Sequence, residues 1–315
     1  MQKNTLTSIA TTTVLGMAVV TALAAGPASA APPVSTPAPT AAPAAGSAQA
    51  TTTPDPSLAT MDATGNHAMG ASIAAHVAPV GTAAGARAQA SVQATAGGPP
   101  PGRLQGMDVS AWQHDVDFGV AYAKGARFAY MKVSEGVSYT SPYYVRQYNA
   151  SAVSGLIRGG YVYAQPSQAS GAATAAYFFA HGGGWSNDGK TLPPLLDIEY
   201  GTAAQGTCYG MTQGAMSAWI SQFSNAVYQR IHRWPAIYTT TDWWKRCTGN
   251  SSSFAGNPLF VALYPVNDFT TPGTVGASWG RWTFWQWAAE GTFPGDQDVT
   301  VHSIRSLRIF AARTD

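Results

Sequence analysis

The sequence predicts a single α/β domain, an irregular β/α barrel of the TIM type, preceded by a signal peptide and a disordered linker. Two observations predict this organisation. The 10 tryptophans, 14 tyrosines and 11 phenylalanines all lie after position 110. The region 103–315 also alternates short apolar runs with helical patterns. Roughly seven or eight strands with mostly helical crossovers are typical of a barrel, whose chemistry lies where the strands end.

Residues 1–30 match the pattern of an export signal. One cation, Lys3, precedes a short apolar stretch, and Ala28-Ser29-Ala30 fits the small-residue cleavage pattern. The apolar stretch is too short to span a bilayer. We therefore expect a secreted, extracellular protein with no membrane contact after the signal has been removed.

Residues 31–102 are expected to form a low-complexity linker or pro-segment. They consist mostly of Ala, Thr, Pro, Gly and Ser and contain no aromatic residue. Such a segment cannot bury enough apolar surface to offset the entropy that is lost on ordering. A short helix is compatible with the less repetitive stretch 61–79, but the sequence assigns that stretch no role. The folded domain is accordingly placed at 103–315.

The elements of this domain follow one another as strand and helix. Each expected strand is short, mostly rich in β-branched or aromatic residues, and bounded by Gly, Pro or a charged residue. The expected strands are 106–110, 128–133, 157–164, 195–199, 236–240, 259–264 and 282–287, and the helical patterns cover 117–124, 142–153, 167–181, 212–230 and 302–312. Pro235 ends the long fourth helix and leads into the next strand.

The charge distribution excludes several classes of function. The net charge is only +2, and no run of Lys and Arg forms the clustered stripe that nucleic-acid binding needs. The six histidines include no pair three or four residues apart, which argues against a zinc hydrolase. We expect no metal, no cofactor and no nucleic-acid partner, and we expect a monomer.

Cys208 and Cys247 are the two cysteines of the chain. Export would place them in an oxidising compartment, where each has only the other as a partner. We therefore predict a disulfide between them, because a catalytic thiol would leave the second cysteine unexplained.

Acidic residues lie in or after the expected strands. Asp108 belongs to the first strand, Asp197 and Glu199 finish the fourth, and Asp296 and Asp298 follow the last. Asp197 and Glu199 are two positions apart, so they share one face of the strand with Cα atoms about 6.6 Å apart. Two like charges at this distance raise the pKa of one carboxyl, and a protonated acid beside an ionised one is what glycosidic cleavage requires. A structural role in ion pairs is the alternative, and the favoured one for Asp108 or Asp298 taken alone.

Aromatic and amide side chains are expected beside these acids as substrate contacts. The candidates are Trp112, Tyr163, Tyr200, Trp285 and Gln286. Sugar rings present apolar C–H faces that stack on aromatic rings, while amides can bind hydroxyl or acetamide groups. Trp285 and Gln286 lie on opposite faces of a regular strand, so only one of them can face the substrate while the other packs in the core. The sequence does not say which.

Several motifs occur in a characteristic order along the domain. They are Gly106-Met107-Asp108-Val109-Ser110-x-Trp112-Gln113, Tyr130-Met131-Lys132-x-Ser134-Glu135-Gly136, Asp197-Ile198-Glu199-Tyr200, Tyr238-Thr239, Phe284-Trp285-Gln286-Trp287 and 295–298. This set resembles glycoside hydrolase family 25, the N-acetylmuramidase lysozymes, in their secreted actinobacterial form. The resemblance covers about 105–300, nearly the whole domain. It implies an irregular β/α barrel that hydrolyses the β-1,4 bond between N-acetylmuramic acid and N-acetylglucosamine in peptidoglycan without a metal.

The resemblance also implies roles for the acids. Glu199 matches the general acid of the family, and Asp108, Asp197 and Asp298 match its other active-site carboxylates. Asp296 competes with Asp298 for the last of these roles, because the sequence after Asp298 departs from the usual pattern. We assign Asp298, since it directly precedes an apolar residue as the pattern requires.

Two other functions remain compatible with the sequence. A non-catalytic module that binds cell walls would need the aromatic residues but not four convergent carboxylates. A glycosidase acting on chitin-like polymers would also use acids at strand ends. For a muramidase, we expect substrate assistance, in which the 2-acetamido oxygen attacks the anomeric carbon while Asp197 stabilises the acetamide N–H.

Overall fold

The computed structural model describes residues 55–73, 76, 98–265 and 269–315. Every described residue belongs to one compact unit, Ser47–Asp315. The expected signal peptide, 1–30, and most of the expected linker lie outside the described residues.

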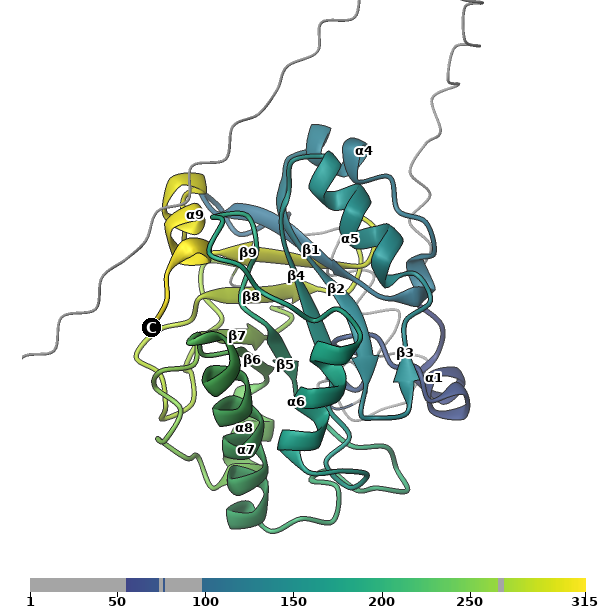
Figure 1. Ribbon diagram of the computed structural model, residues 1–315, viewed down its shortest axis with the longest axis vertical. Helices are drawn as coiled ribbons and strands as arrows, with labels where there is room; N and C mark the ends of the chain where they lie inside the picture. The colour runs from purple at the N-terminus through teal and green to yellow at the C-terminus, as the bar shows by residue number, and fades with distance from the viewer. Residues whose placement is uncertain (1–54, 74–75, 77–97, 266–268) are drawn as a thin grey trace, which may run out of the picture. The chain divides into compact units, whose positions relative to one another are not determined.

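One sheet of nine strands forms the centre of this unit (Figure 1). The strands are β1 (Leu104–Val109), β2 (Ala126–Glu135), β3 (Tyr139–Thr140), β4 (Ile157–Tyr163), β5 (Leu195–Asp197), β6 (Ala236–Thr239), β7 (Leu259–Ala262), β8 (Phe284–Ala288) and β9 (Asp296–Thr300). Their order is β1-β9-β8-β7-β6-β5-β4-β2-β3, and β1 also pairs with β2. That additional pairing closes the sheet into the expected barrel, and β3 is left outside as a short extension of β2.

The barrel is irregular because one of its strands runs against the others. Among the barrel strands, the pairs from β1–β2 and β2–β4 through β7–β8 are parallel, whereas β9 is antiparallel to both β8 and β1. The short β3, outside the barrel, is antiparallel to β2. The sequence predicted no strand at Asp296–Thr300, because this polar stretch lacks the usual strand pattern. Its pairing with a neighbour on each side supplies the backbone hydrogen bonds that the local sequence does not indicate.

Helices follow most of the strands along the chain (Figure 1). They are α1 (Leu58–Thr64), α4 (Phe118–Ala123), α5 (Tyr144–Val153), α6 (Gly171–Ala180), α7 (Gln213–Ile231), α8 (Thr241–Thr248) and α9 (Ile304–Ala312), with a 3-10 turn η1 (Ala111–Gln113) after β1. Side chains of Ser170, Thr212 and Thr240 accept hydrogen bonds from the first turns of α6, α7 and α8. The sequence predicted five of these helices and missed α8, which buries two adjacent tryptophans.

Aromatic rings fill part of the barrel interior. Phe128, Tyr130, Phe260 and Phe284 contact one another from β2, β7 and β8, with ring centroids 5.3 to 6.0 Å apart. Two residues further along β2 and β8, the same inward face carries Lys132 and Gln286, which are fully buried. The interior therefore changes from aromatic to polar toward the carboxyl ends of the parallel strands.

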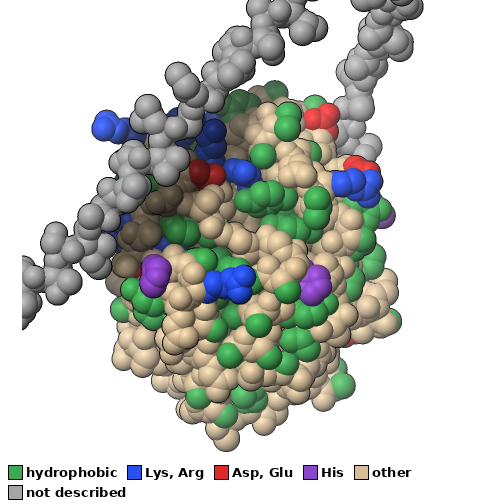
Figure 2. Space-filling view, viewed as in Figure 1, with side chains coloured by type: hydrophobic (Ala, Val, Ile, Leu, Met, Phe, Trp, Pro, Cys, Tyr) green, Lys and Arg blue, Asp and Glu red, His purple; other side chains and the backbone are tan. Residues whose placement is uncertain are grey.

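The disulfide that the sequence predicts is present. Cys208 and Cys247 are bonded, with Cα atoms 5.3 Å apart, and the bond ties the segment after β5 to α8. In the part of the chain that the structure describes, no helix is long and apolar enough to cross a membrane. Uncharged side chains dominate the face in Figure 2, where Lys and Arg stand in small separate groups.

Residues 55–73 depart from the expected linker. They form α1, which begins after a Ser57 cap and ends at Gly65 in the left-handed conformation, and then an irregular stretch against the barrel. Met61, Met69 and Ile73 are buried, at 2%, 0% and 0% exposure. The segment builds no core of its own, and it is ordered by the surface that the barrel offers.

Candidate active site

Four carboxyl groups meet at the polar end of the barrel. Asp108 lies near the end of β1, Asp197 ends β5, Glu199 follows two residues later, and Asp296 begins β9. All are buried, with at most 3% exposure. The antiparallel register pairs Asp108 with Asp296, so both stand at the same level of the barrel. Asp298 pairs instead with Gly106, one inward position deeper.

Gln286 holds two of these groups in place. Its Nε2 donates to Asp108 Oδ2 at 2.8 Å and to Asp296 Oδ2 at 2.6 Å. Its Oε1 accepts from the hydroxyls of Tyr238 at 2.6 Å and Tyr264 at 2.8 Å. Both hydrogens and both lone pairs of the amide are therefore used, which fixes the amide and the two carboxyl groups as one unit.

Burial makes negative charge costly throughout the cluster. It is the largest cause that raises the pKa of Asp197 well above its usual range, followed by repulsion from Glu199 and Asp108. Burial also raises the pKa of Asp108 and Asp296. From the sequence we expected a raised pKa because of like charges alone, whereas desolvation is the larger effect in the structure. The cluster consequently retains protons that separate, exposed carboxyl groups would lose.

Glu199 differs from its neighbours in its hydrogen bonds. Burial raises its pKa, while donors from Ser72 and Gly70 oppose that change. Asp197 has no such donors: both of its carboxyl oxygens are buried without a hydrogen-bond partner among the described residues. The two acids, which lie two positions apart at and just after the end of β5, thus have different surroundings, which is the condition for giving them different chemical roles.

A buried ion pair lies beside this cluster. Lys132 Nζ donates to Glu135 Oε2 at 2.6 Å, and Gln165 Nε2 donates to Glu135 Oε1 at 2.8 Å. Burial alone would raise the pKa of Glu135, but the Lys132 charge and the hydrogen bond from His67 lower it to about 2. No role was predicted for this pair. The sequence nevertheless contains a signal for it. Lys132 lies two positions after Tyr130 on the same strand, so the lysine shares the inward face of that tyrosine.

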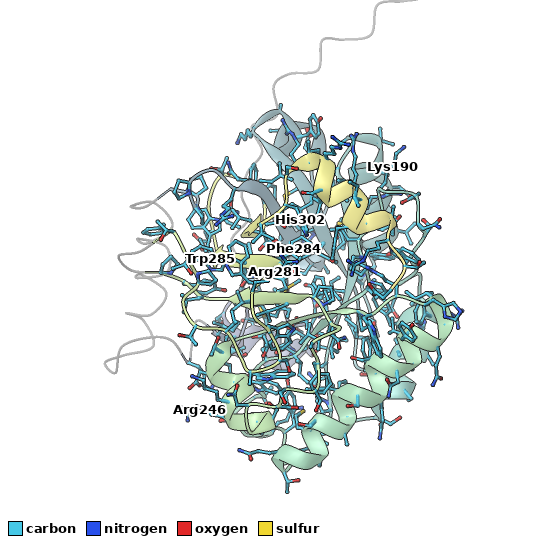
Figure 3. The ribbon with its side chains drawn as sticks, turned by 90° about the vertical axis from the view of Figure 1, so that its left-hand side faces the viewer. Lys190, Arg246, Arg281, Phe284, Trp285 and His302 are labelled. Atoms are coloured by element: carbon cyan, nitrogen blue, oxygen red, sulfur yellow. A yellow bond between two sulfur atoms is a disulfide. The ribbon has the colours of Figure 1, made fainter. Side chains whose placement is uncertain are left out.

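Three of the expected aromatic contacts lie at or just after the ends of barrel strands: Trp112 in η1 after β1, Tyr163 at the end of β4 and Tyr200 directly after Glu199. Tyr163 and Tyr200 are buried, and Trp112 is partly exposed. The structure places Trp285 elsewhere: it is fully buried on the outward face of β8, where its Nε1 donates to the Leu263 carbonyl at 2.7 Å. Figure 3 shows it beside Phe284, the neighbour that faces inward. The strand turns Gln286, and not Trp285, toward the carboxyl groups.

The comparisons with known proteins identify a family. The family model described as glycosyl hydrolases family 25 matches residues 107–296. The N,O-diacetylmuramidase of Chalaropsis sp is 42% identical over 213 residues, which are 66% of this chain and 99% of that protein. A solved muramidase from Acremonium alcalophilum matches with a TM-score of 0.64 and 46% identity, over 67% of this chain and 99% of the other. A lysozyme structure from Streptomyces coelicolor matches with a TM-score of 0.64 and 36% identity, over 68% of this chain and 100% of the other. The chain therefore belongs to glycosyl hydrolases family 25.

Proposed function

We propose that this chain hydrolyses the β-1,4 bond between N-acetylmuramic acid and N-acetylglucosamine in peptidoglycan, with Glu199 as the general acid. The observation that carries the proposal is the convergence of buried carboxyl groups at the polar end of the barrel. Glycosidic cleavage needs one carboxyl that keeps its proton and others that stabilise developing positive charge. Membership of the family supports the reaction class, and relatives named as muramidases and lysozymes support the substrate.

Glu199 is suited to donate the proton. Burial raises its pKa, which favours the protonated form that a general acid needs. Its proton passes to the glycosidic oxygen as the bond from that oxygen to the anomeric carbon breaks.

Asp197 is suited to assist the substrate's own acetamide group. Its two oxygens lack hydrogen-bond partners among the described residues, so they can accept the acetamide N–H of a bound sugar. That hydrogen bond would favour the ionised form of Asp197 and stabilise positive charge as the acetamide oxygen attacks the anomeric carbon. Water then opens the oxazolinium ring, with net retention of configuration.

Asp296 is the better candidate for the fourth carboxylate. It shares Gln286 with Asp108, and the two strands pair these acids in register. Asp298 lies one inward position deeper, and its oxygens have no hydrogen-bond partner within the described residues. We therefore revise the sequence assignment in favour of Asp296.

The test is digestion of purified peptidoglycan, followed by borohydride reduction and mass spectrometry of the products. Reduced muramic acid supports a muramidase, reduced glucosamine supports a different glycosidase, and no new ends from either the full chain or residues 98–315 support a binding module. Glu199→Gln removes the transferable proton, so the rate should fall about 10²–10⁴-fold. Glu290→Gln, outside the cluster, should leave the rate unchanged. Near-normal cleavage by Glu199→Gln would assign the acid to another residue.

Substrate assistance has its own test. Proton NMR of the first-formed product should show the β-anomer, and walls with N-deacetylated muramic acid should resist cleavage. First appearance of the α-anomer, or equal cleavage of deacetylated walls, would refute it.

We also propose that the protein acts outside the cell as a monomer. The export pattern of residues 1–30 and the disulfide between Cys208 and Cys247 support secretion. N-terminal sequencing of the protein from culture medium tests secretion, and light scattering tests its mass.

A further inference from the structure

Residues 66–73, the groove segment, lie against the residues proposed to bind and cleave the substrate. Asn66, His67, Met69, Ser72 and Ile73 are at most 7% exposed, although the segment precedes the barrel in the chain. The barrel is complete without it, because all nine strands lie within Leu104–Thr300. The solved muramidase from Acremonium alcalophilum also matches over 99% of its length with only 67% of this chain. The segment is therefore an addition to the family's domain.

The groove segment binds the general acid directly. The backbone N–H of Gly70 donates to Glu199 Oε1 at 2.7 Å. The backbone N–H and the hydroxyl of Ser72 both donate to Glu199 Oε2, at 3.0 Å and 2.5 Å. Three donors to one carboxyl favour its ionised form. They also occupy both oxygens of the Glu199 carboxyl, so no position is left there for a glycosidic oxygen.

The same segment covers the aromatic residues proposed to stack on sugar rings. The His67 ring stacks on Tyr163 with centroids 4.9 Å apart. Trp112 Nε1 donates to the carbonyl of Asn66 at 2.8 Å. Next to the segment, the ring of His76 stacks on Tyr200 at 3.9 Å and is inclined by only 8°. Flat rings and backbone amides thus occupy the places where sugar rings and acetamides would bind.

The ion pair beside the carboxyl cluster anchors the start of the segment. Glu135 accepts from the backbone N–H of His67 at 2.8 Å and lies 2.6 Å from its Nδ1. Lys132 Nζ donates to the His67 carbonyl at 2.5 Å and to Asn66 Oδ1 at 3.1 Å. These charge-assisted bonds join groups more than 60 positions apart in the sequence, so they specify one register for the segment.

Gly70 marks the deepest point of this contact. A Cβ atom at this position would lie 2.6 Å from Tyr264 Oη, 2.7 Å from Gln286 Oε1 and 3.0 Å from Tyr238 Oη. Its φ of +83° is also a conformation that favours glycine. Only a residue without a side chain fits here, directly against the amide that holds Asp108 and Asp296.

We propose that the groove segment is an intramolecular inhibitor, which keeps the active site closed to peptidoglycan until the segment leaves the groove. It offers the site amides and a hydroxyl but no glycosidic bond, so it occupies the catalytic groups without being cleaved. This inference rests on the proposed function, because it assigns a regulation to the same site.

The first experiment compares the full chain with a barrel form, residues 98–315, on purified peptidoglycan. The barrel form should cleave at least 10-fold faster. A synthetic peptide of residues 55–76 should inhibit the barrel form competitively, raising KM without lowering kcat. The matched control is the same peptide with Gly70→Val, which should inhibit at least 10-fold more weakly.

The second experiment keeps the full chain. Gly70→Val should expel the segment and raise the rate toward that of the barrel form, whereas Ala63→Ser, on the exposed face of α1, should leave the rate unchanged. This comparison uses the full chain, so it does not depend on whether residues 98–315 fold alone.

The outcomes separate the two proposals. A barrel form that unfolds cooperatively but leaves peptidoglycan intact refutes the proposed function. Equal rates for the full chain and the barrel form, with no effect of the peptide, refute the inhibition while the proposed function stands. If the barrel form does not fold, a Gly70→Val rate at or below that of the unaltered chain overturns the inhibition and makes the segment a structural part of the fold.

Discussion

Replacing Lys132 with Met should destabilise the full chain by about 3 kcal/mol at pH 7. Lys132 is fully buried inside the barrel, and its Nζ lies 2.6 Å from Glu135 Oε2. Removing one partner of a buried ion pair leaves the other charge uncompensated, which typically costs about 3–5 kcal/mol. His67 and Gln165 also donate to Glu135, so we expect the lower end of that range.

The pH dependence gives a second measure of the same interaction. The pKa of Glu135 is lowered from 4.5 to about 2, because Lys132 and His67 outweigh the effect of burial. A carboxyl with a depressed pKa in the folded state stabilises the protein above its unfolded pKa. That contribution, about 3 kcal/mol, is lost as the pH falls from about 4.5 to about 2. Lys132→Met should raise the pKa of Glu135 and so flatten this part of the stability profile.

Urea unfolding followed by tryptophan fluorescence measures both effects, at pH 7 and in steps down to pH 2.5. The double variant Lys132→Met with Glu135→Leu is the control. It removes both charges and should recover most of the lost stability. A loss below about 1 kcal/mol in the single variant, or an acid profile identical to that of the unaltered chain, would show that the pair is not the buried unit inferred here.

Three further perturbations have expected results. Replacing Cys208 and Cys247 with Ser opens a loop of 39 positions and should cost about 4 kcal/mol in urea unfolding, whereas a loss below 1 kcal/mol would contradict the chain-entropy estimate. Gly106→Ala would place a Cβ 2.5 Å from the facing phenylalanine ring, so calorimetry should show a stability loss of about 1–3 kcal/mol; an unchanged Tm would contradict this packing. Asp296→Asn in the barrel form should lower kcat on peptidoglycan about 10-fold or more and Asp298→Asn should lower it less; the reverse order would restore the sequence assignment.

Most of the fold was predictable because the sequence patterns of its strands and helices are local. The period of two along a strand placed Asp197 and Glu199 on one face, and the structure has both at the carboxyl end of β5. The strand β9 was missed, since a polar sequence of five residues carries no such pattern and depends on its neighbours for pairing. The same dependence explains the revised fourth carboxylate. Only the register with β1 shows that Asp296 stands opposite Asp108.

The choice of face on β8 could not be made from the sequence. Trp285 and Gln286 are both large, and either could have been directed into the barrel. Closure of the barrel decides the matter, because it brings two tyrosine hydroxyls and two carboxyl groups within reach of one amide. An indole has a single donor and no acceptor, so it could not satisfy those groups. Trp285 instead packs against Trp282 on the outward face, with centroids 5.9 Å apart.

Composition did not predict that the groove segment is ordered, and the physical reason is a different one. By their composition, residues 31–102 cannot bury enough apolar surface to order themselves. Another surface can still order such a segment by supplying hydrogen-bond acceptors. Glu199 and Glu135 are such acceptors, and most of the donors that reach them from the segment are backbone N–H groups, which every residue except proline carries. Composition is a poor predictor of this kind of ordering, because small residues such as Gly70 fit the groove best. A segment of such composition that precedes a barrel is therefore best judged against the buried polar groups that the barrel offers it.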